Sequence, residues 1–207
     1  MQDSEPIGEV VEASSTTFTA ESYELHQPPP LGALVRTAAG AVAVYAVVGL
    51  ASTAGIDPSR RPVARGRATR GAADVYRQHP QLAELLRTQF EALILAHGPL
   101  PAAAEPEEAA VACALAPVPA TLHEHVHLCS AHEARLIGSA PGFVEALAAL
   151  AGRGQLARDE LIPACLRRVA AIQADERSFL LGAAKRLALL MRGDPVALGL
   201  VLGRLRR

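Results

Sequence analysis

The chain has 207 residues, 20 of them basic and 21 acidic, so its net charge is close to zero and its length suits one domain or two small ones. Nineteen of the basic residues are Arg, and Lys185 is the only lysine. A Walker A loop needs a lysine between Gly and Ser or Thr, whereas Lys185 lies between Ala184 and Arg186. The sequence therefore excludes a P-loop ATPase, and the same lysine count excludes a protein kinase.

Cysteine content and the N-terminus indicate a cytoplasmic protein. The three cysteines, Cys113, Cys129 and Cys165, cannot all pair with one another, and the first residues lack the basic and apolar regions of a signal peptide. Residues 37–56 are twenty residues without a charge, about the length of a membrane-spanning helix. Their glycines and clustered valines favour two buried strands joined by a turn, so we expect no membrane partner.

The first third of the chain is predicted to be a small β domain. Residues 7–13 and 16–25 are short β-rich segments separated by a serine turn, and three prolines end the second. Residues 33–38 and 41–52 follow as two further strands. Four short apolar strands predict a barrel, because closure removes edges that such a sheet could not leave exposed.

The rest of the chain is predicted to be mainly helical. Leu82, Leu86, Phe90 and Leu93 recur at three- and four-residue spacing, which predicts an amphipathic helix over residues 82–94. Residues 122–128 form one possible strand. Further helices are expected over residues 141–151, 160–174, 176–192 and 195–207, delimited by Gly, Asp and Pro.

These elements predict an α+β fold: a small N-terminal β-barrel followed by a mainly α-helical C-terminal domain with one possible strand. The predicted organisation is a barrel domain over residues 1–66, an Arg/Gly linker over 67–71 and a helical domain over 72–207. The Pro/Ala/Glu-rich residues 99–120 are expected to form a loop within the helical domain.

A family resemblance lies within residues 5–66, about a third of the chain. It is carried by Ile7-Gly8-Glu9-Val10, Ser14-Ser15-Thr16-Thr17-Phe18, Pro29-Pro30-Leu31-Gly32-Ala33-Leu34-Val35 and Val44-Tyr45-Ala46-Val47-Val48. The segment resembles the HAS barrel, the N-terminal barrel shared by HerA-type DNA translocases and the ATP synthase catalytic subunits. Phe18, Val35, Tyr45 and Val47 are expected to hold its core.

The resemblance implies a role in assembly. In the HerA family a RecA-like motor with a Walker A loop follows the barrel, whereas here a helical domain without that loop follows, which argues against ATPase and helicase activity. HAS barrels sit on one face of a hexameric ring and, in HerA systems, help receive a partner nuclease. We therefore expect a stand-alone, non-catalytic adaptor without a cofactor, whose partner is a HerA-like ring ATPase or its nuclease in a DNA-processing complex. Homo-oligomerisation remains open.

A histidine-rich segment suggests an alternative function. On an extended strand His123, His125, His127 and Cys129 project to one face, and His132 follows after a turn. Imidazole and thiolate suit zinc, so a zinc-binding protein centred on His123, His125, His127 and His132 is the alternative. Alternate strand residues lie roughly 6.5–7 Å apart, so four in a row cannot share one ion, and a merely exposed strand is favoured. A Cys129 nucleophile with a histidine base is a third option.

Charge is distributed unevenly along the chain. The first thirty residues hold six acids and no base, whereas residues 153–207 hold eleven bases and five acids. Arginine makes good bidentate phosphate contacts, although exposed polar faces of helices also account for such residues. The expected contacts with nucleic acid or a protein partner are Arg60, Arg61, Arg65 and Arg67.

Overall fold

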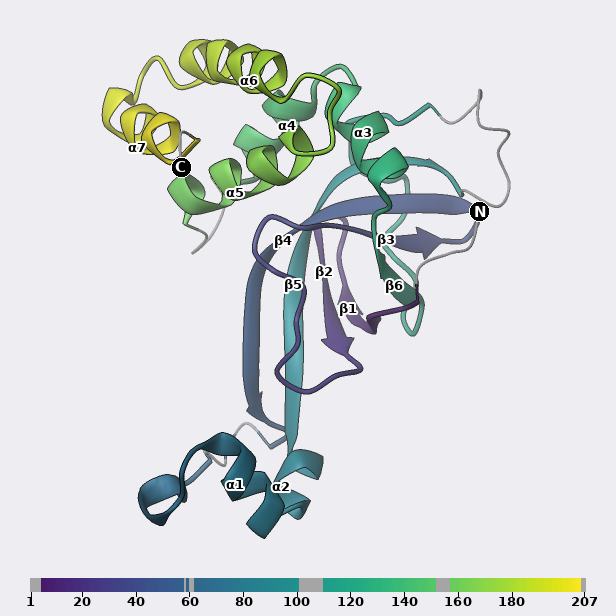
Figure 1. The fold of residues 1–207 in the computed structure, drawn as a ribbon. Coiled ribbons are helices and arrows are strands. Elements are labelled where there is room, and N and C mark those ends of the chain that lie inside the picture. Colours follow the sequence, from purple (N-terminus) through teal and green to yellow (C-terminus); the bar gives the residue numbers. More distant parts are fainter. Residues whose placement is uncertain (1–4, 58, 60–61, 101–109, 152–156, 206–207) are drawn as a thin grey trace.

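The computed structural model describes residues 5–57, 59, 62–100, 110–151 and 157–205. Six strands close into a barrel in the order β1-β2-β5-β4-β3-β6, and most helices gather at one end of it (Figure 1). The strands are β1 (Gly8–Ala13), β2 (Thr17–Ser22), β3 (Leu34–Ala39), β4 (Val42–Gly55), β5 (Leu86–Pro99) and β6 (His125–Leu128). The predicted α+β class is confirmed: an N-terminal closed barrel is followed by a mostly helical C-terminal region.

The helices follow the strands along the chain. They are η1 (Gly66–Ala68), α1 (Ala72–Gln78), α2 (Gln81–Glu84), α3 (Ala131–Ser139), α4 (Phe143–Leu150), α5 (Arg158–Ala170), α6 (Glu176–Leu190) and α7 (Pro195–Leu205). The four helices expected after residue 140 are confirmed within a few residues at each end. Helix α3 is not among the helices predicted from the sequence, although Ser130 followed three residues later by Glu133 matches the capping-box pattern that begins a helix.

The predicted helix over residues 82–94 is wrong. Only the short α2 lies there, and the chain then enters strand β5. Phe90, Ala92 and Ile94 point into the barrel, while Leu93 and Leu95 belong to the hydrophobic cluster shared with the helices. Because β5 is buried on both faces, its apolar residues are nearly continuous and also match helical spacing.

The barrel is not complete at residue 66. Strands β5 and β6 come from the region that the sequence assigned to the helical domain, and β5 lies between β2 and β4. The connection between β4 and β5 contains the predicted linker over residues 67–71 together with α1 and α2, so that linker joins two barrel strands.

Two hydrophobic clusters divide the core. One fills the barrel and includes Phe18 and Val35, as expected. The other lies between the barrel and the helices and includes Tyr45 and Val47, which are buried but point out of the barrel. Successive residues of β4 alternate between the two clusters, so both faces of this strand are covered where it runs beneath the helices.

The charge-free segment of residues 37–56 lies mainly in β3 and β4 rather than in a helix. Among the described residues, no helix is long and apolar enough to cross a membrane.

Candidate docking site

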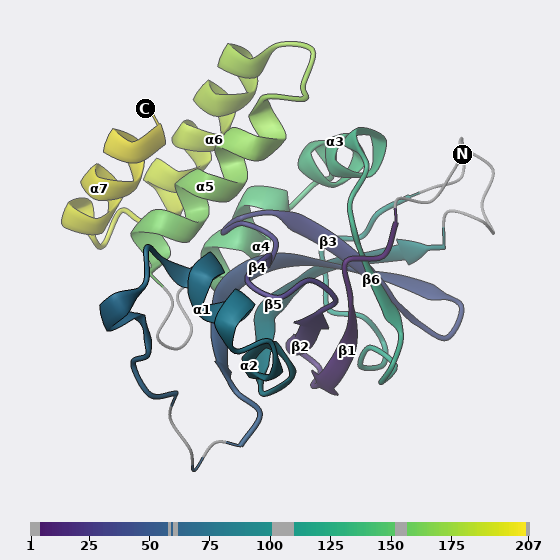
Figure 2. The same ribbon diagram turned by 60° about the horizontal axis from the view of Figure 1, so that its bottom comes forward.

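Strands β4 and β5 extend well beyond the barrel and carry α1 and α2 at their far end (Figures 1 and 2). We call the described part of residues 49–91 the arm. Its two strands pair from Leu50 with Glu91 to Gly55 with Leu86. A register shift lies between Val48 and Leu50, where β4 passes beyond β3, whereas β5 stays paired with β2 as far as Gln89. An irregularity of this kind bends a strand and increases its local twist.

The outer edge of β4 is covered only at its beginning. Strand β3 pairs with β4 from Val42 to Val47, and one further pair of hydrogen bonds joins Val48 to Gly32 and Ala33 at 2.9 Å each. Beyond Val48, no strand of the described chain pairs with this edge of β4. The backbone groups on that edge are therefore available to another strand.

Side chains along the same stretch are exposed and uncharged. Residues 50–54 are all exposed, and Leu50 keeps 55% of its surface. Ile56 and Leu85, at the far end of the arm, are 47% and 58% exposed. Natural edge strands usually carry charges or prolines that prevent pairing, and this edge has neither. An open, uncharged edge suits addition of a strand from a partner.

Hydrogen bonds hold the arm in place from the barrel side. The Thr88 hydroxyl accepts from the backbone N–H of His26 at 2.7 Å and lies 2.8 Å from the Thr53 hydroxyl. The His26 ring lies 2.7 Å from the Tyr76 hydroxyl of α1. Arg87 donates to the carbonyl oxygen of Ile56 at 2.6 Å. These contacts join α1, both arm strands and the loop after β2, so the arm presents its edge in a defined orientation.

Two of the four predicted contact arginines lie at the far end of the arm. Arg67 is in η1 and Arg65 directly precedes it, and both are exposed. Arg60 and Arg61 lie outside the described residues. No ion pair to a described residue occupies Arg65 or Arg67, so this end of the arm offers positive charge to a partner or to phosphate.

The structure separates the predicted histidine ligands. His123 has a positive φ of 65° and lies before β6, with its Nδ1 3.1 Å from Glu9 Oε1. His125 and His127 lie on β6 with ring centroids 6.2 Å apart. His132 is exposed in the first turn of α3. The described residues contain no group of three or more His, Cys, Asp or Glu that could hold a metal ion.

We therefore expect one equivalent of zinc to leave the thermal midpoint of the protein unchanged. An ion bound only to the native state would raise the midpoint, but His125 and His127 alone cannot complete a tetrahedral site. Differential scanning calorimetry with and without zinc makes the measurement. A rise that disappears in a His125→Ala, His127→Ala double variant would contradict this expectation.

A buried ion pair joins the barrel to the helices. Arg36 of β3 lies with its Nε 2.8 Å from Glu133 Oε1 of α3, and both side chains are less than a tenth exposed. The second oxygen of Glu133 accepts from the backbone N–H and the hydroxyl of Ser130, each at 2.8 Å. Burial raises the pKa of the neighbouring Tyr45, and the Glu133 carboxylate adds to that effect. These groups fix the position of α3 rather than forming an exposed reactive site.

The cysteines are poorly placed for nucleophilic catalysis. Burial, and then the nearby Glu133 carboxylate, raises the pKa of Cys129 well above its usual value. Burial raises the pKa of Cys165 to about 12, and this side chain is fully buried. Because the thiolate is the nucleophile, a raised pKa lowers reactivity near neutral pH. This argues against the predicted option of a Cys129 nucleophile.

We expect Cys165 to resist iodoacetamide in the native protein at pH 8. The thiol stays protonated until the pH approaches its raised pKa, and the reagent cannot reach it without opening of the core. Peptide mass spectrometry after timed labelling in buffer and in urea gives the comparison. Native labelling of Cys165 as fast as that of the unfolded chain would show that this packing is wrong.

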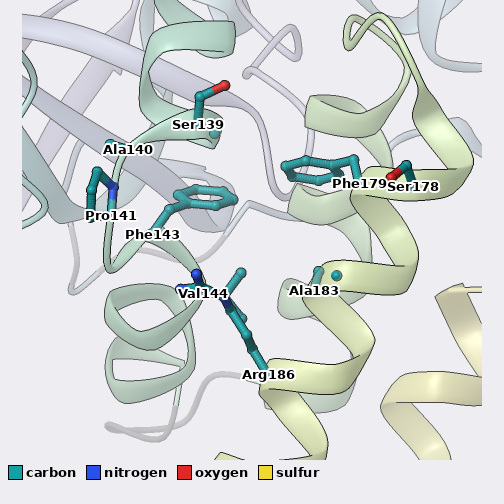
Figure 3. Close-up of a pocket in the computed structure, with 11 residues that line it drawn as sticks. Ser139, Ala140, Pro141, Phe143, Val144, Ser178, Phe179, Ala183 and Arg186 are labelled. Atoms are coloured by element: carbon teal, nitrogen blue, oxygen red, sulfur yellow. The ribbon is translucent and has the colours of Figure 1, made fainter.

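A hollow of about 340 Å³ lies between the α3–α4 connection and α6 (Figure 3). The rings of Phe143 and Phe179 form part of its wall, with centroids 6.5 Å apart. Arg186 reaches its edge, where its Nη1 lies 2.9 Å from Glu145 Oε1. The arginine charge is thus already compensated, and the lining holds no pair of groups suited to acid–base chemistry.

Comparison of the chain with models of known protein families and with curated proteins gives no match. The candidate docking site is therefore supported by the geometry of the structure and not by a known relative. The charge-free segment of residues 37–56 was recognised in the sequence, but it was expected to be buried throughout. The sequence signal for an arm is the length of the apolar segment over residues 41–52, which exceeds what the preceding segment over residues 33–38 can cover as a paired strand.

Proposed function

We propose that this protein is a non-catalytic cytoplasmic adaptor of HAS-barrel type that docks through its arm onto a HerA-like ring ATPase or the nuclease of such a complex. The observation that carries the proposal is the open, uncharged edge of β4 on an arm that is hydrogen-bonded to the loop after β2. Strand addition to such an edge gives affinity through backbone hydrogen bonds, and neighbouring side chains give specificity. The resemblance of the barrel supplies the class of partner.

The position of the single lysine supports a protein that has no ATPase motor of its own. Lys185 lies exposed in the middle of α6. The phosphate-binding lysine of a P-loop lies instead where a glycine-rich loop leads into the start of a helix. The adaptor would therefore depend on its partner for nucleotide hydrolysis.

Arg65 and Arg67 give the far end of the arm a second role in the proposal. Both arginines belong to the far end of the arm, where Ile56 and Leu85 are also exposed, so a partner strand and a phosphate group could be engaged at the same end. Phosphate contacts of this kind weaken steeply with salt. DNA binding by the arm would therefore be confined to low ionic strength.

Affinity purification from the cells that make the protein tests the proposal. We expect the intact chain to recover a ring ATPase or its nuclease, and Leu50→Asp to abolish that recovery because it places a charge beside the open edge. Leu122→Asp in the turn before β6 is the matched control, since Leu122 is 53% exposed and lies outside the arm. Circular dichroism confirms that both variants are folded.

Three results of this experiment would overturn the proposal. The intact chain could recover neither a ring ATPase nor its nuclease. Leu50→Asp could recover the same proteins as the intact chain. Both variants could lose the partner equally, which would point to a general effect of added charge rather than to the arm.

A further inference from the structure

Helix α6 is poorly covered for a helix of its length. It has fifteen residues, and only Ala183 and Leu187 are buried. Leu181 and Leu189 are 55% and 74% exposed. An amphipathic helix normally buries a continuous apolar stripe. Much of the apolar surface of α6 is instead exposed to solvent in the isolated chain.

Helices α6 and α7 both pack on α5 (Figure 1). A groove lined by residues of both helices lies between them. Arg204 of α7 is fastened to α5 through ion pairs with Asp159 and Glu160. The groove has a volume of about 1140 Å³, and its apolar lining includes Leu180, Leu181, Ala184, Gly199, Leu202 and Gly203. It lies at the end of the molecule opposite to α1 and α2 (Figure 1).

The side of the groove formed by α7 favours a helix as its occupant. Gly199 and Gly203 are one turn apart, and outside the neighbouring backbone of α7 no heavy atom of the described residues lies within 4 Å of the position that a Cβ would take on either residue. A partner helix could therefore approach this backbone closely. Val196 and Leu200 extend the same side of α7 and are 74% and 49% exposed. An incoming helix would contact apolar surface on both sides of the groove.

The charges around the groove select an acidic partner. Arg177 lines the groove, and Lys185 lies one turn from Leu181 on the same helix and is exposed. Arg192 is exposed just beyond α6. Glu176 is the only acid in the described lining. A second copy of the chain would bring this basic surface against itself, whereas acidic residues on a partner would complement it.

We propose that the α6–α7 groove binds an amphipathic helix of a partner protein whose apolar stripe is flanked by acidic residues. This inference is independent of the adaptor function proposed for the arm, because it uses different elements at the other end of the molecule. The two sites together would allow one chain to bridge two partners.

Designed peptides test the groove directly. Two helical peptides of roughly 18 residues, about five turns, carry the same leucine stripe with either Glu or Lys beside it. We expect the Glu peptide to bind the intact protein at least about tenfold more tightly than the Lys peptide, with an affinity that falls as salt rises. Fluorescence anisotropy of labelled peptides measures both constants.

Leu181→Asp is expected to weaken binding of the Glu peptide about tenfold or more, because the new carboxylate faces the apolar stripe and the acidic flanks. Leu122→Asp, in the turn before β6 and outside both proposed sites, is the matched control and should bind the Glu peptide as the intact protein does. Equal binding of the two peptides, no binding of the Glu peptide, or an equal effect of the two variants would overturn the inference. It would also be overturned if size-exclusion chromatography with light scattering showed a dimer that Leu181→Asp converts to a monomer, since a second copy would then occupy the groove.

Discussion

Replacement of Arg36 by Ala is expected to lower the free energy of unfolding by about 3–5 kcal/mol, the usual range for removal of one member of a buried ion pair. The buried Glu133 carboxylate would remain in the first turn of α3. One of its oxygens would lose the Arg36 guanidinium, which lies 2.8 Å away in the native protein. The loss arises mainly from an uncompensated buried charge. Urea denaturation followed by circular dichroism gives the free energy.

A double variant separates this effect from the lost packing of the arginine side chain. Arg36→Met with Glu133→Gln removes both charges and keeps side chains of similar length, and the amide oxygen of the new glutamine can still accept from Ser130 in the capping box. We expect the double variant to recover most of the stability lost in Arg36→Ala. If Arg36→Ala costs less than about 1 kcal/mol, the value typical of an exposed pair, the pair is not buried as described.

Replacement of Gly32 by Ala is expected to destabilise the protein by about 2–5 kcal/mol. Gly32 has a φ of 75°, which costs an L-residue about 1–2 kcal/mol. Its added Cβ would also lie 2.5 Å from the backbone nitrogen of Cys165 and 2.7 Å from the carbonyl carbon of Ala164, both in α5. Backbone atoms inside a helix cannot move aside, so crowding adds about 1–3 kcal/mol.

Gly40→Ala is the matched control for Gly32→Ala. Gly40 has a similar φ of 61°, but nothing lies within 4 Å of the position of its added Cβ. We expect this variant to lose only the conformational part, about 1–2 kcal/mol. Equal losses in the two variants, measured by urea denaturation, would mean that α5 does not rest against the start of β3.

The C-terminal helices could be predicted from the sequence because their ends are marked locally. Asp175 caps α6 by accepting from the backbone N–H of Ser178, and Asp194 accepts from the N–H of Ala197 in the first turn of α7. Such signals act within a few residues and need no knowledge of the tertiary fold. The first four strands were found for a similar reason, since turn-forming residues separate them.

Strand β5 could not be predicted in the same way. Whether Phe90 and Leu93 belong to a helix or a strand depends on what covers each of them, and the two residues lie in different clusters. One cluster is inside the barrel and the other beneath the helices, so only the tertiary fold distinguishes the two periodicities. The ion pair of Arg36 and Glu133 was missed because its partners are distant in the sequence and meet only when α3 packs on β3.

The candidate site was predicted only in part. The sequence indicated the charge-free segment and the neighbouring arginines, and two of these, Arg65 and Arg67, lie at the far end of the arm. The exposure of residues 50–54 could not be predicted from the sequence, because it depends on β3 beginning at Leu34, opposite Val47. The groove between α6 and α7 also depends on how two well-predicted helices diverge across α5.

Photo-cross-linking from the arm tests the proposed adaptor function most directly. A photoreactive amino acid replaces Ser52 on the exposed edge of β4, and a second variant carries it in place of His132, exposed on α3 away from the arm. After irradiation in the cells that make the protein, mass spectrometry identifies the cross-linked chains. We expect a ring ATPase or its nuclease to be cross-linked from position 52 and not from position 132. Products from position 52 that contain neither protein, or the same products from both positions, would contradict the adaptor function.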